Sequence, residues 1–157
     1  MNKFDDVVQF SKDAIEWWDK IYKLRYTIAV TEQGIAETDE FDSTDTDKCI
    51  YFSGIIGEET IACCRVEDDV NTGEQNVARI ERVAVDKRFR KKGFGRAIMK
   101  VAEAYIERSG KYNKITVNAQ KQAVPFYECV GYKVVSDEKS VIGIPHYEMQ
   151  KELRGNK

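Results

Sequence analysis

The chain has 157 residues, the usual length of a single domain and enough to bury a hydrophobic core. Hydrophobic residues make up 42% and charged residues 33% of it, with only 10 Gly and 2 Pro, which excludes disordered and fibrous proteins. The formal net charge of −2 argues against a general nucleic-acid binder, because such proteins carry a surplus of Lys and Arg. We therefore expect one globular domain over residues 1–157 that has no nucleic-acid partner.

No segment predicts a leader or a membrane anchor. The N-terminus lacks a basic stretch followed by an apolar one, and no apolar run approaches the roughly 18 residues of a membrane helix. We therefore expect a cytoplasmic protein without a membrane partner. None of the cysteines has C-x-x-C spacing, so we predict no metal site and expect reduced, apolar side chains at Cys49, Cys63, Cys64 and Cys129.

The first half of the chain predicts a helix followed by a β-hairpin. Asp13 and Glu16 have the spacing of a capping box, and apolar residues then recur at helical spacing as far as Ile28. Two polar stretches predict loops, at 37–48 and 67–76. The hairpin strands are rich in β-branched and aromatic residues and cover Ile50–Ile55 and Thr60–Val66.

The second half predicts strands that alternate with helices. A strand over Val77–Val85 is followed by a charged loop, and apolar residues from Phe94 onward then mark one face of a helix that stops at Gly110. A short helix has Pro125 in its first turns and ends at Gly131. The other predicted strands are 114–118, 132–135 and 147–153. This order predicts an α/β fold, or α+β under a stricter definition, with a mixed, mostly antiparallel sheet flanked by helices.

A basic loop with two glycines joins the strand that ends at Val85 to the long helix. A helix N-terminus leaves about four backbone N–H groups unpaired and carries about half a positive charge, so it can hold a phosphate. Gly93 and Gly95 let the backbone approach an anion closely. Mobile positive charge around them comes from Arg90, Lys91, Lys92 and Arg96. The loop therefore predicts a pyrophosphate site, with a solvated basic turn as the alternative.

The common nucleotide-binding patterns do not fit this loop. No G-x-x-x-x-G-K-[ST] is present, and Ile98 stands where a dinucleotide fingerprint requires Gly or Ala. A protein that uses the same loop for ATP or NAD is therefore a weaker alternative.

Two blocks of the sequence carry a resemblance to a known family: Val83–Asp86 with the basic loop after it, and Asn118–Gln120 with residues 125–132. Together they resemble the GNAT superfamily of acetyl-CoA-dependent N-acetyltransferases. Val83-Ala84-Val85-Asp86 followed by the loop 90–95 is similar to the family's motif for the coenzyme A pyrophosphate. Asn118-Ala119-Gln120 followed by residues 125–132 is similar to a later motif, in which a short helix presents a tyrosine. The resemblance covers about residues 49–153 and implies the GNAT fold and transfer of an acetyl group from acetyl-CoA to a primary amine.

The resemblance also implies which residues contact the cofactor. The pantetheine arm of acetyl-CoA would follow Val83 and Val85 where two parallel strands splay apart, and Asn118 on the neighbouring strand would face it. The pyrophosphate would lie against Arg90, Lys91, Lys92, Gly93, Phe94, Gly95 and Arg96.

Acetyl transfer to an amine needs an acid and a base. Tyr127 stands at the family's general-acid position, where it would protonate the departing coenzyme A thiolate. An amine that resembles Lys, with a pKa near 10.4, is protonated at neutral pH, so a base must remove that proton. Glu81 is our candidate base because it alternates with Val83 and Val85 on one strand face. Glu32 and His146 are competing candidates.

The predicted acceptor site lies in the N-terminal part of the chain. Leu24-Arg25 leading to Glu32-Gln33, with the acidic segment 37–48 after it, resembles one bacterial branch of the family, as does Gly143-Ile144-Pro145-His146. We therefore predict acceptor-binding roles for Arg25, Glu32 and His146. The acidic segment could attract a cationic amine such as a polyamine or a lysine side chain, or it could be a solvated loop.

The acceptor is expected to be a small-molecule or peptide amine, and a homodimer is an option that the sequence leaves open. A non-catalytic acyl-CoA-binding regulatory module is the main alternative to an enzyme, although Tyr127 argues against it.

Overall fold

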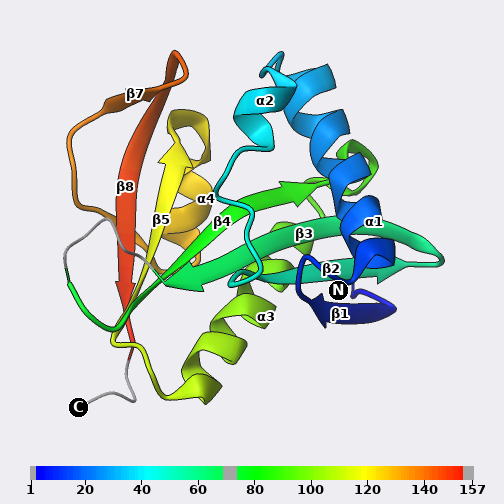
Figure 1. Cartoon of the computed structure of the whole chain (residues 1–157). Helices are drawn as coiled ribbons and strands as arrows, with labels where there is room; N and C mark the ends of the chain where they lie inside the picture. The colour runs from blue at the N-terminus through cyan, green and yellow to red at the C-terminus, as the bar shows by residue number, and fades with distance from the viewer. Residues whose placement is uncertain (1–2, 69–73, 154–157) are drawn as a thin grey trace. The chain divides into compact units, whose positions relative to one another are not determined.

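The computed structural model describes residues 3–68 and 74–153, whose backbone groups into two compact units (Figure 1). The first unit comprises residues up to 67 together with 82–103, and the second comprises 68–81 together with the residues from 104 onward. Strand β4 (Val77–Val85) and helix α3 (Phe94–Ser109) each contribute residues to both units. The single domain predicted over residues 1–157 stays a prediction.

The first unit is built on an antiparallel meander of β1 (Asp6–Phe10), β2 (Ile50–Ile56) and β3 (Glu59–Asp68). Strands β2 and β3 form the predicted hairpin, which turns at Gly57 with a φ of 63°. This left-handed conformation suits glycine, which has no Cβ to clash with the backbone. The end of β4 continues the sheet beside β3, where the Asp86 N–H donates to the Ile61 carbonyl at 2.7 Å.

Helix α1 (Ile15–Arg25) lies against this meander and continues as a π-helix, η1 (Tyr26–Glu32). Its apolar face packs into a core formed with the strands by Phe10, Ile21, Leu24, Cys49, Tyr51 and Cys63. The predicted capping box is wrong, because Ala14 is the N-cap and no side chain caps the helix. Asp13 instead accepts a hydrogen bond from the Ser11 hydroxyl in the preceding turn.

The two predicted loops are shorter in the structure. The first contains the short helix α2 (Glu37–Glu40), which the sequence analysis did not predict. The second begins later because β3 runs to Asp68, and the part of it at 69–73 lies outside the described residues. The charged loop after β4 contains a 3-10 helix, η2 (Lys87–Phe89), capped by the Asp86 carboxylate, which accepts from the Arg88 N–H.

The second unit extends from the first residues of β4. These pair in parallel with β5 (Lys114–Gln120), which pairs antiparallel with β8 (Ile144–Glu152). Strand β8 also pairs antiparallel with β6 (Lys133–Val134) and β7 (Lys139–Val141). The helical segment after β5 consists of η3 (Lys121–Ala123) and α4 (Val124–Cys129). The predicted mixed, mostly antiparallel sheet with flanking helices is therefore confirmed.

Strand β7 was missed by the sequence analysis. It forms a hairpin with β8 through Ile142 and Gly143, whose φ angles are both positive, at 55° and 74°. Two such residues match the tight hairpin turn that usually carries Asn-Gly or Asp-Gly. Because isoleucine rarely adopts a positive φ, the pair Ile-Gly gives only a weak turn signal.

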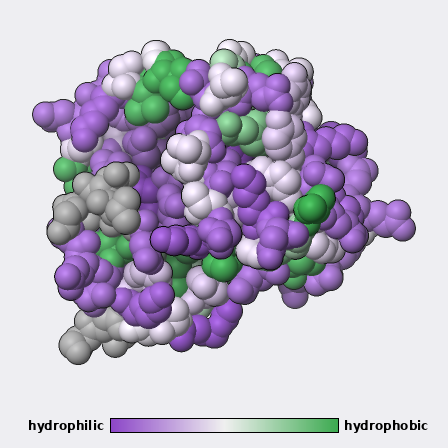
Figure 2. All heavy atoms as spheres, in the orientation of Figure 1, coloured by the Kyte–Doolittle hydropathy of each residue, from purple (hydrophilic) through white to green (hydrophobic). Residues whose placement is uncertain are grey.

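The surface is polar on the side shown in Figure 2, where hydrophobic residues form small separate groups. No helix among the described residues is long and apolar enough to cross a membrane. Cys49, Cys63 and Cys64 are buried and unpaired as expected, whereas Cys129 is exposed, so the expectation of an apolar packing role is wrong for that residue.

Candidate active site

The basic loop predicted to bind a pyrophosphate lies between β4 and α3 in the first unit. Lys91 and Gly93 both adopt left-handed conformations, with φ of 61° and 90°. Such changes of hand turn successive backbone N–H groups toward one side, as in anion-binding nests. The Ala97 N–H donates the helical hydrogen bond to the Gly93 carbonyl at 3.0 Å, so the N–H groups of the first turn have no acceptor within the helix.

The side chains of this loop divide by exposure. Phe94 is buried against the rings of Phe4 and Phe89, at centroid distances of 5.1 and 5.8 Å, so its side chain belongs to the core. The basic side chains of the loop are exposed at Arg90, Lys91, Lys92 and Arg96. The result is a positively charged backbone turn fixed to the core by one aromatic ring.

Arg90 connects two of the predicted sites within the first unit. Its Nε donates to the Val85 carbonyl at 2.9 Å, and its Nη2 forms an ion pair with Glu32 Oε1 at 2.8 Å. Both side chains of the ion pair are partly exposed. The structure therefore brings a predicted cofactor residue, Arg90, together with a predicted acceptor residue, Glu32.

Strand β4 contains an irregularity that the sequence analysis did not anticipate. Arg82 has a φ of 53° in the middle of the strand, between Glu81 and Val83. A left-handed residue interrupts the regular alternation of side chains along a strand. Simple alternation alone therefore does not place Glu81 on the face of Val83 and Val85, and that step stays a prediction.

In the second unit, Glu81 belongs to a group of charged residues around Arg79. The Arg79 side chain is 7% exposed and contacts Glu81 Oε1 at 3.7 Å from its Nε, while its Nη2 donates to Glu148. Glu148 lies directly opposite Asn118 in the β5–β8 ladder, and Asn118 is exposed. The parallel ladder between β4 and β5 ends at Arg79 and Thr116, although β5 continues to Gln120.

Tyr127 lies in helix α4 and is 9% exposed. Its ring makes edge contacts with Phe126 and Tyr132 at centroid distances of 5.0 and 6.0 Å. The helix closes at Gly131, whose φ of 102° lets the Tyr132 N–H reach the Tyr127 carbonyl at 3.0 Å. The short helix and its glycine therefore fix the position of Tyr127, as predicted for this motif.

His146 lies in β8 opposite Gln120 of β5 and Lys139 of β7. It is 9% exposed, and its Nδ1 is 2.8 Å from the Ile144 carbonyl. The histidine is thus held between two neighbouring strands of the second unit.

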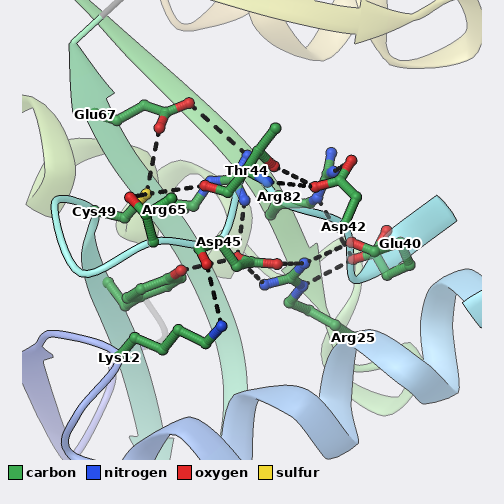
Figure 3. Close-up of polar contacts among 12 residues, drawn as sticks. Lys12, Arg25, Glu40, Asp42, Thr44, Asp45, Cys49, Arg65, Glu67 and Arg82 are labelled. Carbon is green, nitrogen blue, oxygen red and sulfur yellow. Dashed lines mark hydrogen bonds and ion pairs between the residues drawn. The ribbon is translucent and has the colours of Figure 1, made fainter. Parts of the chain in front are cut away.

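Arg25 is buried in a group of charged and polar residues that we call the Arg25 cluster, which consists of Arg25, Glu40, Asp45, Tyr51 and Arg65. Figure 3 labels Arg25, Glu40, Asp45 and Arg65. Arg25 Nε pairs with Glu40 at 2.8 Å, and its Nη1 and Nη2 donate to the two oxygens of Asp45 at 3.0 and 3.1 Å. The guanidinium also lies over the Phe41 ring at 4.7 Å. These contacts hold the acidic segment 37–48 on α1. They also occupy the Arg25 guanidinium, which was predicted to bind the acceptor.

Asp45 is the centre of the Arg25 cluster. Besides Arg25, it accepts hydrogen bonds at Oδ1 from Arg65 Nη1 and from the Tyr51 hydroxyl, each at 2.8 Å. Burial acts to raise the pKa of Asp45, but its hydrogen bonds and the two arginine charges outweigh burial and lower the pKa to about 2. Burial, together with the hydrogen bond to Asp45, raises the pKa of Tyr51.

Sequence reasoning identified Arg25 but not its partners. Arg65 is a charged residue between the apolar run 61–64 and Val66 in a strand of the hairpin, which is a signal that a buried countercharge must exist. The identity of that countercharge, Asp45, depends on how the acidic segment folds back over β2 and β3. Among the described residues, no group of acidic, histidine or cysteine side chains is arranged to hold a metal ion.

Comparisons with known proteins agree with these features. A family model described as an acetyltransferase (GNAT) domain matches residues 58–153. A Bacillus subtilis protein provisionally named an acetyltransferase is 32% identical over 133 residues, which cover 83% of this chain and 86% of that protein. The crystal structure of a provisionally named N-acetyltransferase from Lactobacillus plantarum has a TM-score of 0.85 and 28% identity, covering 98% of this chain and 100% of that one.

A more distant structure has the same fold. The PaiA N-acetyltransferase from Thermoplasma acidophilum, solved in complex with coenzyme A, has a TM-score of 0.67 and 14% identity, covering 94% of this chain and 99% of that one. The family model and the Bacillus relative lead to one conclusion. The chain belongs to the GNAT acetyltransferase family and is an acyltransferase that uses a coenzyme A thioester.

Proposed function

We propose that the protein transfers the acetyl group of acetyl-CoA to a primary amine of a small molecule or peptide. The observation that carries this proposal is the junction of β4 with α3, where two left-handed residues precede the N-terminus of a 16-residue helix and exposed basic side chains surround it. This junction offers backbone N–H groups, a helix dipole and mobile cations to one anion. A diphosphate fits that combination of donors.

The residues that would hold the cofactor lie along β4 and its loop. Arg90, Lys91, Lys92 and Arg96, with the backbone from Gly93 to Gly95, would bind the pyrophosphate, and Val83 and Val85 would offer backbone groups to the pantetheine arm. Arg90 already uses one guanidinium edge on the Val85 carbonyl, and its other contact is the partly exposed ion pair with Glu32. Exposed ion pairs contribute little free energy, so a diphosphate can replace that pair at small cost.

Asn118, in the second unit, stays our candidate contact for coenzyme A by resemblance to the family. It is exposed on β5 beyond the point where the ladder with β4 ends, so its amide is available to a ligand.

Two side chains of the second unit would perform proton transfer. Glu81 would accept a proton from the ammonium form of the acceptor, directly or through a water, which leaves a nucleophilic amine. As the new C–N bond forms and the C–S bond breaks, Tyr127 would give its hydroxyl proton to the departing thiolate. The edge contacts from Phe126 and Tyr132 support this role because they restrict the rotation of the phenol.

A cationic amine suits the acceptor site. Glu32 and His146 remain our candidates for direct contact, while Arg25 is better suited to hold the acidic segment than to touch the acceptor, because it is 2% exposed. Asp39 and Glu37 are exposed on that segment and would attract a positive charge. Polyamines and lysine side chains are therefore the acceptors to test first.

The first experiment tests cofactor binding by calorimetric titration of the protein with acetyl-CoA. The double charge reversal Arg90→Glu and Arg96→Glu should weaken binding by at least about 30-fold, because each arginine makes a charge-assisted contact to phosphate. Lys100→Glu, an exposed charge reversal further along α3, is the matched control and should change the dissociation constant less than twofold. No saturable binding by the wild-type protein would refute the proposal.

A second experiment tests the chemistry by measuring free thiol released from acetyl-CoA with spermidine and with a lysine peptide blocked at its N-terminus. Tyr127→Phe should lower kcat by about 10²-fold or more and leave acetyl-CoA affinity within twofold, because only the hydroxyl is removed. Unchanged turnover in Tyr127→Phe would remove Tyr127 from the catalytic role.

A further inference from the structure

The conformation of Arg82 is the least expected feature of β4. A φ of 53° is rare for a residue with a Cβ, and glycine is the usual choice at such positions. Residues in sparsely populated conformations persist when the surrounding structure holds them, and they concentrate at functional sites. Arg82 stands between the proposed base Glu81 and the proposed cofactor contact Val83.

The contacts of the Arg82 side chain are with the acidic segment of the same unit (Figure 3). Its Nη2 lies 3.5 Å from Asp42 Oδ2, and its Nε lies 3.9 Å from Glu40 Oε2. The Arg82 Nε is buried and makes no hydrogen bond to any described residue, so these ion pairs are what compensates its charge there. Glu40 is itself fixed, because its Oε2 also pairs with Arg25 Nε at 2.8 Å.

The backbone of residue 82 is held from the other side by β3. Its carbonyl accepts a hydrogen bond from the buried Cys63 thiol at a donor–acceptor distance of 3.8 Å. The side chain of Arg82 is thus anchored on the acidic segment while its carbonyl faces β3. Both anchors act on the one residue whose backbone leaves the regular strand conformation.

We propose that Arg82 is a positioning residue for the acyl-transfer reaction. Its ion pairs with Asp42 and Glu40 hold residue 82 in the left-handed conformation, and that conformation sets the path of β4 from Glu81 to Val83. This inference rests on the proposed function, which gives Glu81 and Val83 their roles. Proton transfer and nucleophilic attack depend on placement within fractions of an ångström, so loss of the anchor lowers turnover while the pyrophosphate loop keeps its affinity.

The test compares two substitutions that remove the same side chain. Arg82→Ala removes the anchor and keeps a Cβ that disfavours a positive φ, whereas Arg82→Gly removes the anchor but adopts a positive φ as readily as a negative one. We expect Arg82→Ala to lower kcat by about tenfold and Arg82→Gly to recover turnover to within about threefold of the wild-type value. Acetyl-CoA affinity should stay within twofold in both.

A third variant keeps the proposal testable if Arg82→Ala does not fold. Asp42→Asn leaves residue 82 and its backbone preferences intact and removes one ion-pair partner of Arg82. The Asp42 side chain that changes is 38% exposed. It should lower kcat by about threefold with the melting temperature within about 3 °C of the wild type. Asp19→Asn, an exposed change on α1 outside the acidic segment, is the matched control and should have no effect on kcat.

The outcomes separate this inference from the proposed function. If wild-type protein binds no acetyl-CoA or acetylates no amine, the proposed function fails before any variant is made. If the wild type is active and Arg82→Ala keeps its kcat, or Arg82→Ala and Arg82→Gly are equally impaired, the positioning role is overturned. If Arg82→Ala does not fold, an unchanged kcat in Asp42→Asn overturns the positioning role of Arg82.

Discussion

Replacing Asp45 with asparagine removes the charge that two buried arginines share. The side chains of Arg25 and Arg65 are each 1% exposed, and the Asp45 side chain between them is 2% exposed. Asparagine keeps the shape of the carboxylate, but its amide N–H₂ points a donor at a guanidinium that also donates. The substitution therefore removes one of the countercharges of two buried arginines and leaves Arg25 with Glu40 and Arg65 with Glu67, and such a loss is strongly destabilising.

The pKa of Asp45 sets the size of the effect. Lowering it from 3.8 to about 2 corresponds to about 2 kcal/mol of folding free energy from the charge at neutral pH. The pKa already includes the hydrogen bond from Arg25, but the new amide adds a donor that faces a donor of Arg25, so we expect Asp45→Asn to lower the free energy of unfolding by about 3 kcal/mol. In a chain of this length the melting temperature should fall by roughly 10 °C.

The same pKa predicts how the effect depends on pH. The folded state holds the pKa of Asp45 below its unfolded value, so its contribution is complete above about pH 5 and is lost as the pH falls through 4 toward 2. By pH 3 the difference between the wild type and Asp45→Asn should have shrunk by about 1 kcal/mol, because asparagine does not titrate.

Urea unfolding at pH 7, 5, 4 and 3, followed by tryptophan fluorescence, measures both quantities. Trp18 is a suitable reporter because its ring lies 5.5 Å from that of Tyr51, a member of the Arg25 cluster. Asp39→Asn is the control and should unfold like the wild type at each pH. Equal stability of wild type and Asp45→Asn at pH 7, or a difference that does not change between pH 5 and pH 3, would refute this reasoning.

Two further predictions follow from packing and exposure. Gly54→Ala should lower the melting temperature by about 4 °C in a thermal melt, because its Cβ would lie 2.4 Å from the Phe4 ring and displace that ring from Phe94; an unchanged melting temperature would contradict this. Native protein should react with one equivalent of Ellman's reagent, at the exposed thiol, since burial raises the pKa of Cys63 to about 12. Cys129→Ser should abolish that reaction, and two or more reactive thiols in native protein would contradict the prediction.

Local patterns determined most of the secondary structure. Sequence patterns predicted the hairpin, the strand Val77–Val85 and the helix that begins at Phe94. Each has regularly spaced apolar residues or a glycine at its end. The short helix around Tyr127 was readable for the same reason, since Pro125 and Gly131 mark its two ends. The family resemblance rested on residues within those same elements.

The errors occurred where the local sequence pattern favours one conformation and the surrounding structure adopts another. Asp13 forms a turn with Ser11 in place of the predicted capping box. Strand β7 depends on Ile142 adopting a positive φ, which its own side chain disfavours. In both cases the neighbouring structure outweighs a local preference of about 1 kcal/mol.

The sequence by itself determined the order of the elements, the basic loop and the tyrosine helix, because each depends on residues close together in the chain. Tertiary structure alone decided that Arg25 is a buried partner of Asp45 and that Arg82 breaks the alternation of β4. These outcomes depend on charges brought together from segments separated by 20 residues or more, as in the pairs of Asp45 with Arg25 and Arg65. A buried charge must find a partner, but only the folded chain decides which one.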